Sequence, residues 1–499
     1  MLRLTVVLAV SAVCLWGCSS SNDSVFIDSP KFEDPPFLSS SDGSLSLTLE
    51  SAESQITVAG NTVTARVFNG VYIPPVFRLQ QGDTLRVKQV NRLPNLPVNL
   101  HTHGVVTTPL LNGDNVFVVV DPEETFDTEI PIPLAHSSGM FWYHPHVHPY
   151  VNQEIAQGMS SALIIGDILA PFPELANITE RVMILKDLKL DGNTVVDNPD
   201  PSGPTLRTIN GVYQPEIAIA PGELQFWRIG NLGANIYYDL VMPGVTFHVI
   251  AVDGNLQNQV TSTDELIVPP GGRYEVLVRG PDKPGSYVLT TKAFNTGPNG
   301  DEYPEQVMGR LMVAGEPITD PIPLPTAFPD LPDLRAESVD NARTVVFNDT
   351  DDPNVFVIDN QIWDRDRIDQ TVMLGNLEEW TIENAAQELH VFHIHQGDFQ
   401  VTEIDGVPQP FTGYQDVVSL PSAADDGTPS VVKFLLKFDP PIIVGEYVYH
   451  CHIVQHEDQG MMANILVEDA LARTVKAQEP RDLIAESLTP ATGNYWCES

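Results

Sequence analysis

The sequence predicts an all-β protein of three tandem sandwich domains. Its 499 residues suffice for about three domains of ~150 residues each. Its 42 prolines and 34 glycines, without a long amphipathic period, are typical of many short strands and turns. One segment also occurs three times, with a Gly and an Asn enclosing an alternating apolar and polar strand, at 82–91, 222–231 and 375–384. Such alternation predicts a half-buried sandwich strand, and the wide spacing indicates tandem domains rather than a solenoid.

The N-terminus predicts an exported protein. Arg3 precedes an apolar stretch over 4–16 that is shorter than the ~20 residues of a membrane span. The stretch ends in Leu15-Trp16-Gly17-Cys18, which resembles the lipobox of bacterial lipoproteins. We therefore expect a lipoprotein-type signal peptide over 1–18, a lipid anchor at Cys18, and a periplasmic or cell-surface location, as an outer-membrane lipoprotein. Trp16 is unusual in that motif, so ordinary signal cleavage nearby is the alternative.

Proline clusters and polar runs set the expected boundaries. Residues 19–44 are rich in Ser and Asp and predict a polar tether. Prolines then separate three units. We expect a first domain over 45–170, a second over 174–315, a third over 333–468 and a C-terminal tail over 469–499. Cys497 in this tail is interpreted as an incidental thiol.

The charge balance excludes some partners. The chain has 26 Lys and Arg against 66 Asp and Glu, a formal charge of −40. Such an acidic surface repels nucleic acid and anionic lipid headgroups. We expect no nucleic-acid partner, and membrane contact only through Cys18. With four cysteines in all, two of them in the expected signal peptide, the chain has no evident disulfide framework.

The stretch from Tyr449 to Met461 carries the most chemistry. The residues before it, 445–449, predict a strand. On a strand His450 and His452 share one face, and Cys451 points to the other. Cys451, His456 and Met461 supply a thiolate, an imidazole and a thioether. With a second imidazole from elsewhere, this set suits a blue copper, while His450 and His452 are free to hold other metals.

Three further histidine motifs accompany this stretch. They are His101-Thr102-His103, His144-Pro145-His146 and His390-Val391-Phe392-His393-Ile394-His395. A single His-x-His pair has many non-metal explanations. Four motifs, one of them flanking a Cys with His and Met, predict a multinuclear metal site.

With these motifs, residues 45 to 468 resemble the multicopper oxidases, the laccase-like family of three cupredoxin domains, in their bacterial form. The resemblance implies Greek-key cupredoxin-like sandwiches and four coppers per chain. It implies a type 1 copper on His390, Cys451 and His456, with Met461 axial, and a type 2 copper on His101 and His393. It assigns the type 3 pair to His103, His144, His146, His395, His450 and His452. The eight histidines of the last two sets divide equally between the first and third domains, so we expect them at that interface, with the middle domain as a spacer.

Reduction of O₂ to water also needs protons. Glu457 matches an acid that related bacterial enzymes place beside the cluster, and it is our candidate general acid; its alternative role is to orient a ligand imidazole. For the family's other acid, the matching offset holds Asn112, and Asp114 is our candidate substitute. His136, His148 and His248 are interpreted as structural.

The electron donor is less constrained. We expect O₂ as acceptor and phenols or aromatic amines as donors, with Cu(I), Fe(II) or Mn(II) as overlapping possibilities. The 10 methionines are scattered, which does not support a methionine-rich cuprous oxidase. A copper nitrite reductase would need no type 3 pair. The alternative is a copper-tolerance protein, either a cuprous or other metal oxidase or a copper-binding protein with incidental turnover.

Overall fold

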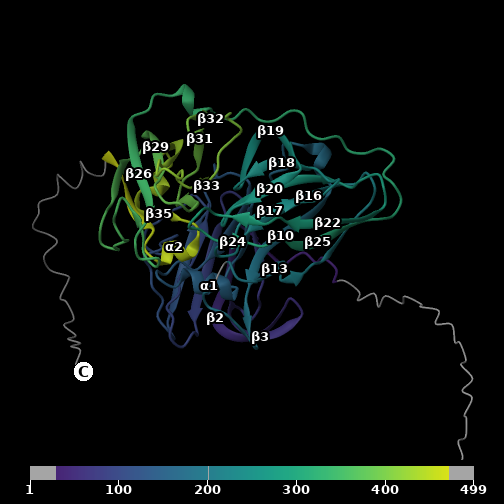
Figure 1. Cartoon of the computed structure of the whole chain (residues 1–499), viewed down its shortest axis with the longest axis horizontal. Coiled ribbons are helices and arrows are strands. Elements are labelled where there is room, and N and C mark those ends of the chain that lie inside the picture. Colours follow the sequence, from purple (N-terminus) through teal and green to yellow (C-terminus); the bar gives the residue numbers. More distant parts are fainter. Residues whose placement is uncertain (1–29, 200–201, 471–499) are drawn as a thin grey trace, which may run out of the picture.

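The structure, a computed structural model, describes residues 30–199 and 202–470. The predicted signal peptide with Cys18, and the tail beyond 470 with Cys497, lie outside the described residues. Strands make up nearly all of the regular structure, in three β-sandwiches (Figure 1). None of the described helices is long and apolar enough to cross a membrane.

The first sandwich pairs two sheets, with strand orders β1-β4-β9-β8-β6 and β11-β12-β3-β2-β5-β7. One short helix, α1 (Val151–Gln157), precedes β9. The strands are β1 (Phe37–Ser39), β2 (Ser44–Val58), β3 (Asn61–Phe68), β4 (Val76–Leu79), β5 (Thr84–Asn91), β6 (His101–His103), β7 (Thr125–Pro131), β8 (Gly139–His144), β9 (Ser161–Ile165), β11 (Leu190–Asp191) and β12 (Thr194–Val195).

The second sandwich has strand orders β14-β13-β10-β16-β21-β18-β19 and β15-β25-β22-β17-β20, with a β23-β24 ribbon. A 3₁₀ turn, η1 (Pro173–Leu175), precedes it. Its strands are β10 (Thr179–Leu188), β13 (Leu206–Ile209), β14 (Val212–Tyr213), β15 (Glu216–Ile219), β16 (Leu224–Asn231), β17 (Tyr238–Val241), β18 (Phe247–Val252), β19 (Asn255–Thr263), β20 (Glu265–Val268), β21 (Arg273–Arg279), β22 (Gly285–Thr291), β23 (Phe294–Asn295), β24 (Glu302–Tyr303) and β25 (Gln306–Val313).

The third sandwich has strand orders β27-β26-β29-β34-β31-β32 and β28-β36-β35-β30-β33. It also contains α2 (Val454–Asp458) and two 3₁₀ turns, η2 (Leu334–Ala336) and η3 (Pro441–Ile443). Its strands are β26 (Asn341–Asp349), β27 (Phe356–Ile358), β28 (Gln370–Met373), β29 (Leu377–Asn384), β30 (His390–Ile394), β31 (Phe399–Ile404), β32 (Val407–Pro408), β33 (Val417–Leu420), β34 (Ser430–Lys437), β35 (Gly445–Cys451) and β36 (Met462–Glu468).

The threefold sequence repeat forms one structural unit in each sandwich. Its strands β5, β16 and β29 each pair in parallel with an earlier long strand, β2, β10 and β26. The leading glycines have positive φ angles of 90°, 76° and 92° at Gly82, Gly222 and Gly375, which glycine adopts most easily. Each closing Asn is buried and donates its side-chain amide to carbonyls of neighbouring loops. The repeat is therefore a turn, a strand and a buried loop clamp.

The N-terminal segment differs from the predicted tether. Within 30–44, β1 pairs in parallel with β4, and Phe32 donates its backbone N–H to Glu216 of the second sandwich. Phe32 also packs against the buried core of the second and third sandwiches. The polar composition of this segment gives no sign of its strand pairing, because backbone hydrogen bonds need no apolar side chains.

The three sandwiches meet around the two α-helices. Figure 1 shows the first sandwich (purple and blue), the second (teal) and the third (yellow-green) in contact, with α1 and α2 between them. One buried apolar cluster runs continuously through the second and third sandwiches. A smaller one joins Val454 of α2 to residues of the first two sandwiches, such as Ile155 and Ile184. This packing fixes the strand ends that carry the histidines.

Candidate copper centres

Strand pairing brings the histidine motifs together. On the first sandwich, His101 of β6 lies opposite His144 of β8. On the third, His393 of β30 lies opposite His450 of β35, and Phe392 lies opposite Cys451. Because side chains alternate along a strand, His450 faces the first sandwich while Cys451 faces the interior of the third, as the sequence predicted.

The eight predicted type 2 and type 3 histidines form one group, which we call the histidine cluster. The rings of His101 and His395 stack with centroids 3.9 Å apart, and those of His103 and His393 stack at 3.8 Å. The Nε2 atom of His450 lies 3.3 Å from that of His146 and 3.2 Å from that of His395. All eight are buried. The cluster therefore lies between the first and third sandwiches, where the sequence predicted it.

The hydrogen bonding of the cluster leaves nitrogens for metal ions. His393, His144 and His450 each donate Nδ1–H to a backbone carbonyl, at 2.8, 2.8 and 3.0 Å. Such bonds hold the tautomer in which Nε2 is free to ligate. Several buried cluster nitrogens have no hydrogen-bond partner, namely Nε2 of His101, His144 and His393, Nδ1 of His103, His146 and His395, and both nitrogens of His452. Buried polar atoms are normally satisfied, so these atoms fit a group of bound metal ions.

The electrostatics support the same interpretation. Burial lowers the pKa of His101, His393 and His395, and neighbouring histidines lower it further. The imidazoles are therefore neutral, which is the form that binds metals. Three sets of cluster nitrogens lie within 4.8 Å of one another: His101 with His103 and His144, His101 with His393 and His395, and His146 with His395 and His450.

The predicted type 1 residues form a second group inside the third sandwich. The Sγ atom of Cys451 lies 3.7 Å from Nδ1 of His390 and 3.8 Å from Nδ1 of His456, and these two nitrogens are 3.1 Å apart. Met461 is buried in the same core, and its carbonyl accepts the backbone N–H of Cys451. One thiolate and two imidazoles, with the thioether of Met461 in the same core, match the donor set of a blue copper.

The two predicted acids both contact the histidine cluster. Asp114 accepts Nδ1–H of His101 at 3.0 Å, whereas Asn112 bonds the carbonyl of Asp127. Burial raises the pKa of Asp114 to about 7. Glu457 lies 3.1 Å from Nδ1 of His450 and 3.5 Å from Nδ1 of His146. Both carboxylates are buried, where they can orient imidazoles or hold a proton.

Sequence reasoning missed a carboxylate and the cation that holds it. Asp416, just before β33, lies 3.2 Å from Nε2 of His103. Arg273 of β21 donates both terminal amino groups to Asp416, each at 2.7 Å, and its Nε–H to the carbonyl of Met140 at 3.2 Å. The middle domain is therefore more than a spacer, because Arg273 joins the other two domains at the cluster. Neither residue belongs to a local motif, so no sequence signal marked them.

Two further carboxylates contact the type 1 histidines and were also missed. Asp349 at the end of β26 lies 3.1 Å from Nε2 of His390. Glu388 lies 3.8 Å from Nε2 of His456 and accepts the hydroxyl of Thr296 from the second sandwich. These carboxylates sit at the histidine edges that face away from Cys451.

The remaining histidines lie outside both groups. Nε2 of His136 accepts the backbone N–H of Val106, and Nδ1 of His248 bonds the hydroxyl of Ser262. His148 packs against Trp363.

A thiolate site and a cluster of neutral imidazoles, linked by one short peptide, define a copper-dependent oxidoreductase. Three family models described as multicopper oxidase match residues 50–168, 142–308 and 333–470. The chain belongs to the multicopper oxidase family, with cupredoxin-like Greek-key domains, and is an oxidoreductase that uses copper and O₂.

Individual relatives are distant but cover most of the chain. A multicopper oxidase of Staphylococcus haemolyticus is 24% identical, over 80% of this chain and 83% of its own. A laccase of Bacillus subtilis is 25% identical, over 81% and 90%. The cell division protein FtsP of Escherichia coli is 25% identical, over 87% and 92%. A solved multicopper oxidase of Campylobacter jejuni, described as a metallo-oxidase, aligns with a TM-score of 0.76 at 25% identity, over 88% and 95%.

Proposed function

We propose that this protein couples the one-electron oxidation of donors to the four-electron reduction of O₂ to water. Four donor molecules each give one electron, and O₂ takes up four electrons and four protons to form two waters. The bound coppers would supply the one-electron redox chemistry. The proposed type 1 ligands are His390, Cys451, His456 and Met461. The proposed cluster ligands are His101 and His393 for type 2, and His103, His144, His146, His395, His450 and His452 for the type 3 pair.

One observation carries this proposal, the direct covalent link between the two groups. Cys451 contacts His390 and His456 in one group, and its chain neighbour His450 contacts His146 and His395 in the other. A protein that only stores copper has no need of such a link. It favours transfer of electrons over storage.

The residues of the chain also provide for protons and for exclusion of water. Asp114 and Glu457 are buried against cluster histidines. Burial raises the pKa of Asp114 to about 7, so Asp114 can hold a proton near the site of O₂ reduction. For Glu457 the effect of burial is outweighed by the neighbouring His450 and His146, which lower its pKa, so Glu457 can accept a proton as a carboxylate and pass it on. The eight cluster histidines are buried as well, which limits the escape of reactive intermediates to solvent.

Phenols and aromatic amines are the broad donor class of the proposal. The laccase and metallo-oxidase relatives represent the two overlapping donor classes. The carboxylate of Asp349, at the outer edge of the type 1 histidine His390, favours divalent ions such as Fe(II) or Mn(II) among the metal donors, because carboxylate oxygens suit such cations. Cu(I) is the third metal donor in the proposal.

The second candidate is a copper-tolerance protein that binds copper and turns over only incidentally. The similarity to the cell division protein FtsP shows that a relative can be named for a role other than oxidation. The unpartnered imidazole nitrogens of the cluster favour a full complement of copper and hence catalysis. For either function we propose export to the periplasm or cell surface with a lipid anchor at Cys18.

Oxygen uptake by purified, copper-loaded protein tests the proposal. Phenols, aromatic amines and reduced metal ions would be supplied in turn, with consumed donor and O₂ counted together. We expect about four copper atoms per chain and four electrons per O₂ without accumulation of peroxide. Full copper loading without uptake on any donor would support the storage role instead.

A further inference from the structure

Gln396 has an unusual backbone conformation next to the histidine cluster. It follows His395 directly and has a φ angle of 59°, in the left-handed region that non-glycine residues seldom occupy. The residue is 3% exposed. Strained residues of this kind are retained where the surrounding structure uses them. Gln396 contributes to neither of the two groups of proposed ligands, so any role it has must come from its side-chain contacts.

Both ends of the Gln396 amide bond the first domain. The Oε1 atom accepts the backbone N–H of Thr107 at 2.7 Å, and the Nε2 atom donates to Oδ2 of Asp114 at 3.1 Å. The other oxygen of Asp114 accepts Nδ1–H of His101 at 3.0 Å and the backbone N–H of Thr102 at 3.1 Å. The Nε2 atom of His101 is buried and has no partner. Gln396 therefore fixes the carboxylate that fixes a proposed ligand.

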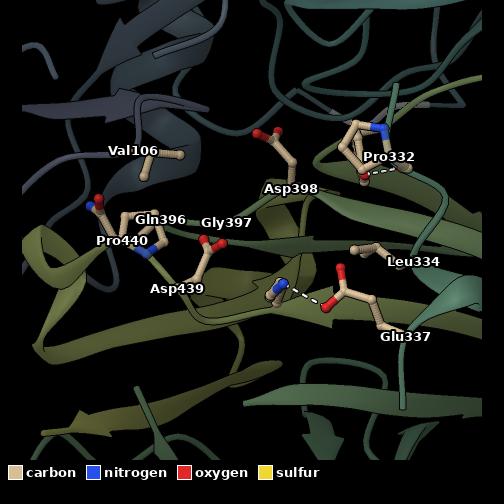
Figure 2. Close-up of a pocket in the computed structure, with 11 residues that line it drawn as sticks. Val106, Pro332, Leu334, Glu337, Gln396, Gly397, Asp398, Asp439 and Pro440 are labelled. Atoms are coloured by element: carbon tan, nitrogen blue, oxygen red, sulfur yellow. Dashed lines mark hydrogen bonds and ion pairs between the residues drawn. The ribbon is translucent and has the colours of Figure 1, made fainter. Parts of the chain in front are cut away.

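Gln396 also lines a cavity of about 260 Å³. Figure 2 shows Gln396, Val106 and Pro440 at one end of it, and Pro332, Leu334 and Glu337 at the other. The cavity is large enough for several water molecules. Its carboxylates are those of Asp398, Asp439 and Glu337, the last paired with Lys437. Gln396 thus lines the cavity and is also linked through Asp114 to His101 by hydrogen bonds.

We propose that Gln396 is a positioning residue that acts through Asp114 on His101, and that it separates this cavity from the type 2 side of the cluster. The inference rests on the proposed function, because it concerns a histidine assigned to copper there. By holding Oδ2 of Asp114, the amide keeps Oδ1 on Nδ1–H of His101. That bond leaves Nε2 of His101 as its ligating atom.

Replacement by glycine tests this role without straining the backbone. Gln396→Gly removes both side-chain hydrogen bonds, while glycine adopts a positive φ angle easily. Gln214→Gly is a matched control, because Gln214 also has a positive φ angle, 52°, in the second domain and outside the cavity lining. Loss of an outer partner of a ligand, here the aligned carboxylate of Asp114, commonly weakens metal binding roughly 10- to 100-fold. We expect that loss for type 2 copper in Gln396→Gly, and the parent affinity in Gln214→Gly.

The type 2 signal in electron paramagnetic resonance, measured relative to the type 1 signal, reports this loss without turnover. Azide, a small anion that binds copper, tests whether Gln396 separates the cavity from the cluster. We expect azide to bind faster in Gln396→Gly than in the control. Parent-like type 2 affinity in Gln396→Gly would overturn the positioning role, and an unchanged azide rate would overturn the separating role.

A second variant and a double mutant test whether the effect passes through Asp114. Gln396→Glu keeps the length of the side chain and the acceptor for Thr107 but loses the donor to Asp114, so it should also weaken type 2 copper. In an Asp114→Ala background, Gln396→Gly should cause no further loss, since its partner is gone. Fully additive losses would overturn the proposed route. A parent protein that binds no copper would instead overturn the proposed function and, with it, this inference.

Discussion

The two groups of proposed copper ligands differ in how the chain assembles them. The type 1 group is built within one sandwich, from β30, β35 and the segment around α2. The histidine cluster draws equally on the first and third sandwiches, and the second sandwich contributes Arg273, which acts through Asp416. The type 1 group therefore requires only that one domain folds, whereas the cluster requires that domains dock. Substitutions should therefore be able to remove copper from one group while the other group keeps it.

Cys451→Ser should have the largest effect, because it removes the soft ligand and the link between the groups. We expect complete loss of the blue absorption and of donor oxidation, with about three coppers retained at the cluster. Visible absorption and metal analysis check this result. Retained blue colour would show that Cys451 is not the type 1 ligand.

Arg273→Met should disrupt the histidine cluster and leave the type 1 group intact. Arg273 and Asp416 are both fully buried, and removal of one partner of a buried ion pair costs about 3–5 kcal/mol. We expect loss of cluster copper while the type 1 absorption is retained, together with a lower unfolding temperature.

Arg279→Met is the matched control for Arg273, because Arg279 is on the same strand and donates to carbonyls of Gly222 and Ile322, outside the cluster. If Arg273→Met lost both kinds of copper equally, the distinction between folding and docking would be wrong.

Glu457→Gln should slow O₂ reduction while leaving both groups assembled. A positioned proton donor contributes roughly 10²- to 10⁴-fold to a rate, and glutamine keeps the shape of the side chain. Reoxidation of the fully reduced protein by O₂ measures this step. Glu446→Gln, on β35 and outside the cluster, is the control. Loss of copper in place of loss of rate would assign Glu457 the orienting role.

Met461→Leu should have the smallest effect, and it tests whether Met461 is the axial group of the type 1 copper. Loss of the thioether should raise the type 1 potential while copper stays bound. Redox titration of the blue absorption measures the potential. Met462→Leu is the control, since Met462 packs in a different apolar cluster with Val116 and Val448. A lowered or unchanged potential would argue against Met461 as the axial group.

A feature could be predicted from the sequence when the residues that produce it lie close together along the chain. The threefold repeat predicted β5, β16 and β29 because the turn glycine and the clamping Asn lie within one strand of each other. The alternation around Cys451 predicted opposite faces for Cys451 and its histidine neighbours. Asp114 was a weaker prediction, because its position relative to His101 depends on the loop between them.

Other features could not be predicted from local patterns. The segment 30–44 resembles a tether in composition but pairs with β4 and with the second sandwich. Gln396 follows a histidine motif, yet its value lies in two bonds to another domain. Arg273 has no motif at all, and its partner Asp416 is far along the chain.

The sequence by itself determined the three sandwich domains, the separation of Cys451 from its flanking histidines and the residue types of both groups, because strand alternation and turn chemistry act over a few residues. Only the tertiary structure decided which nitrogens are left without partners, which carboxylates orient them, and that the middle domain contributes Arg273. Those features depend on burial and on contacts between domains, and a chain has neither until its domains have packed.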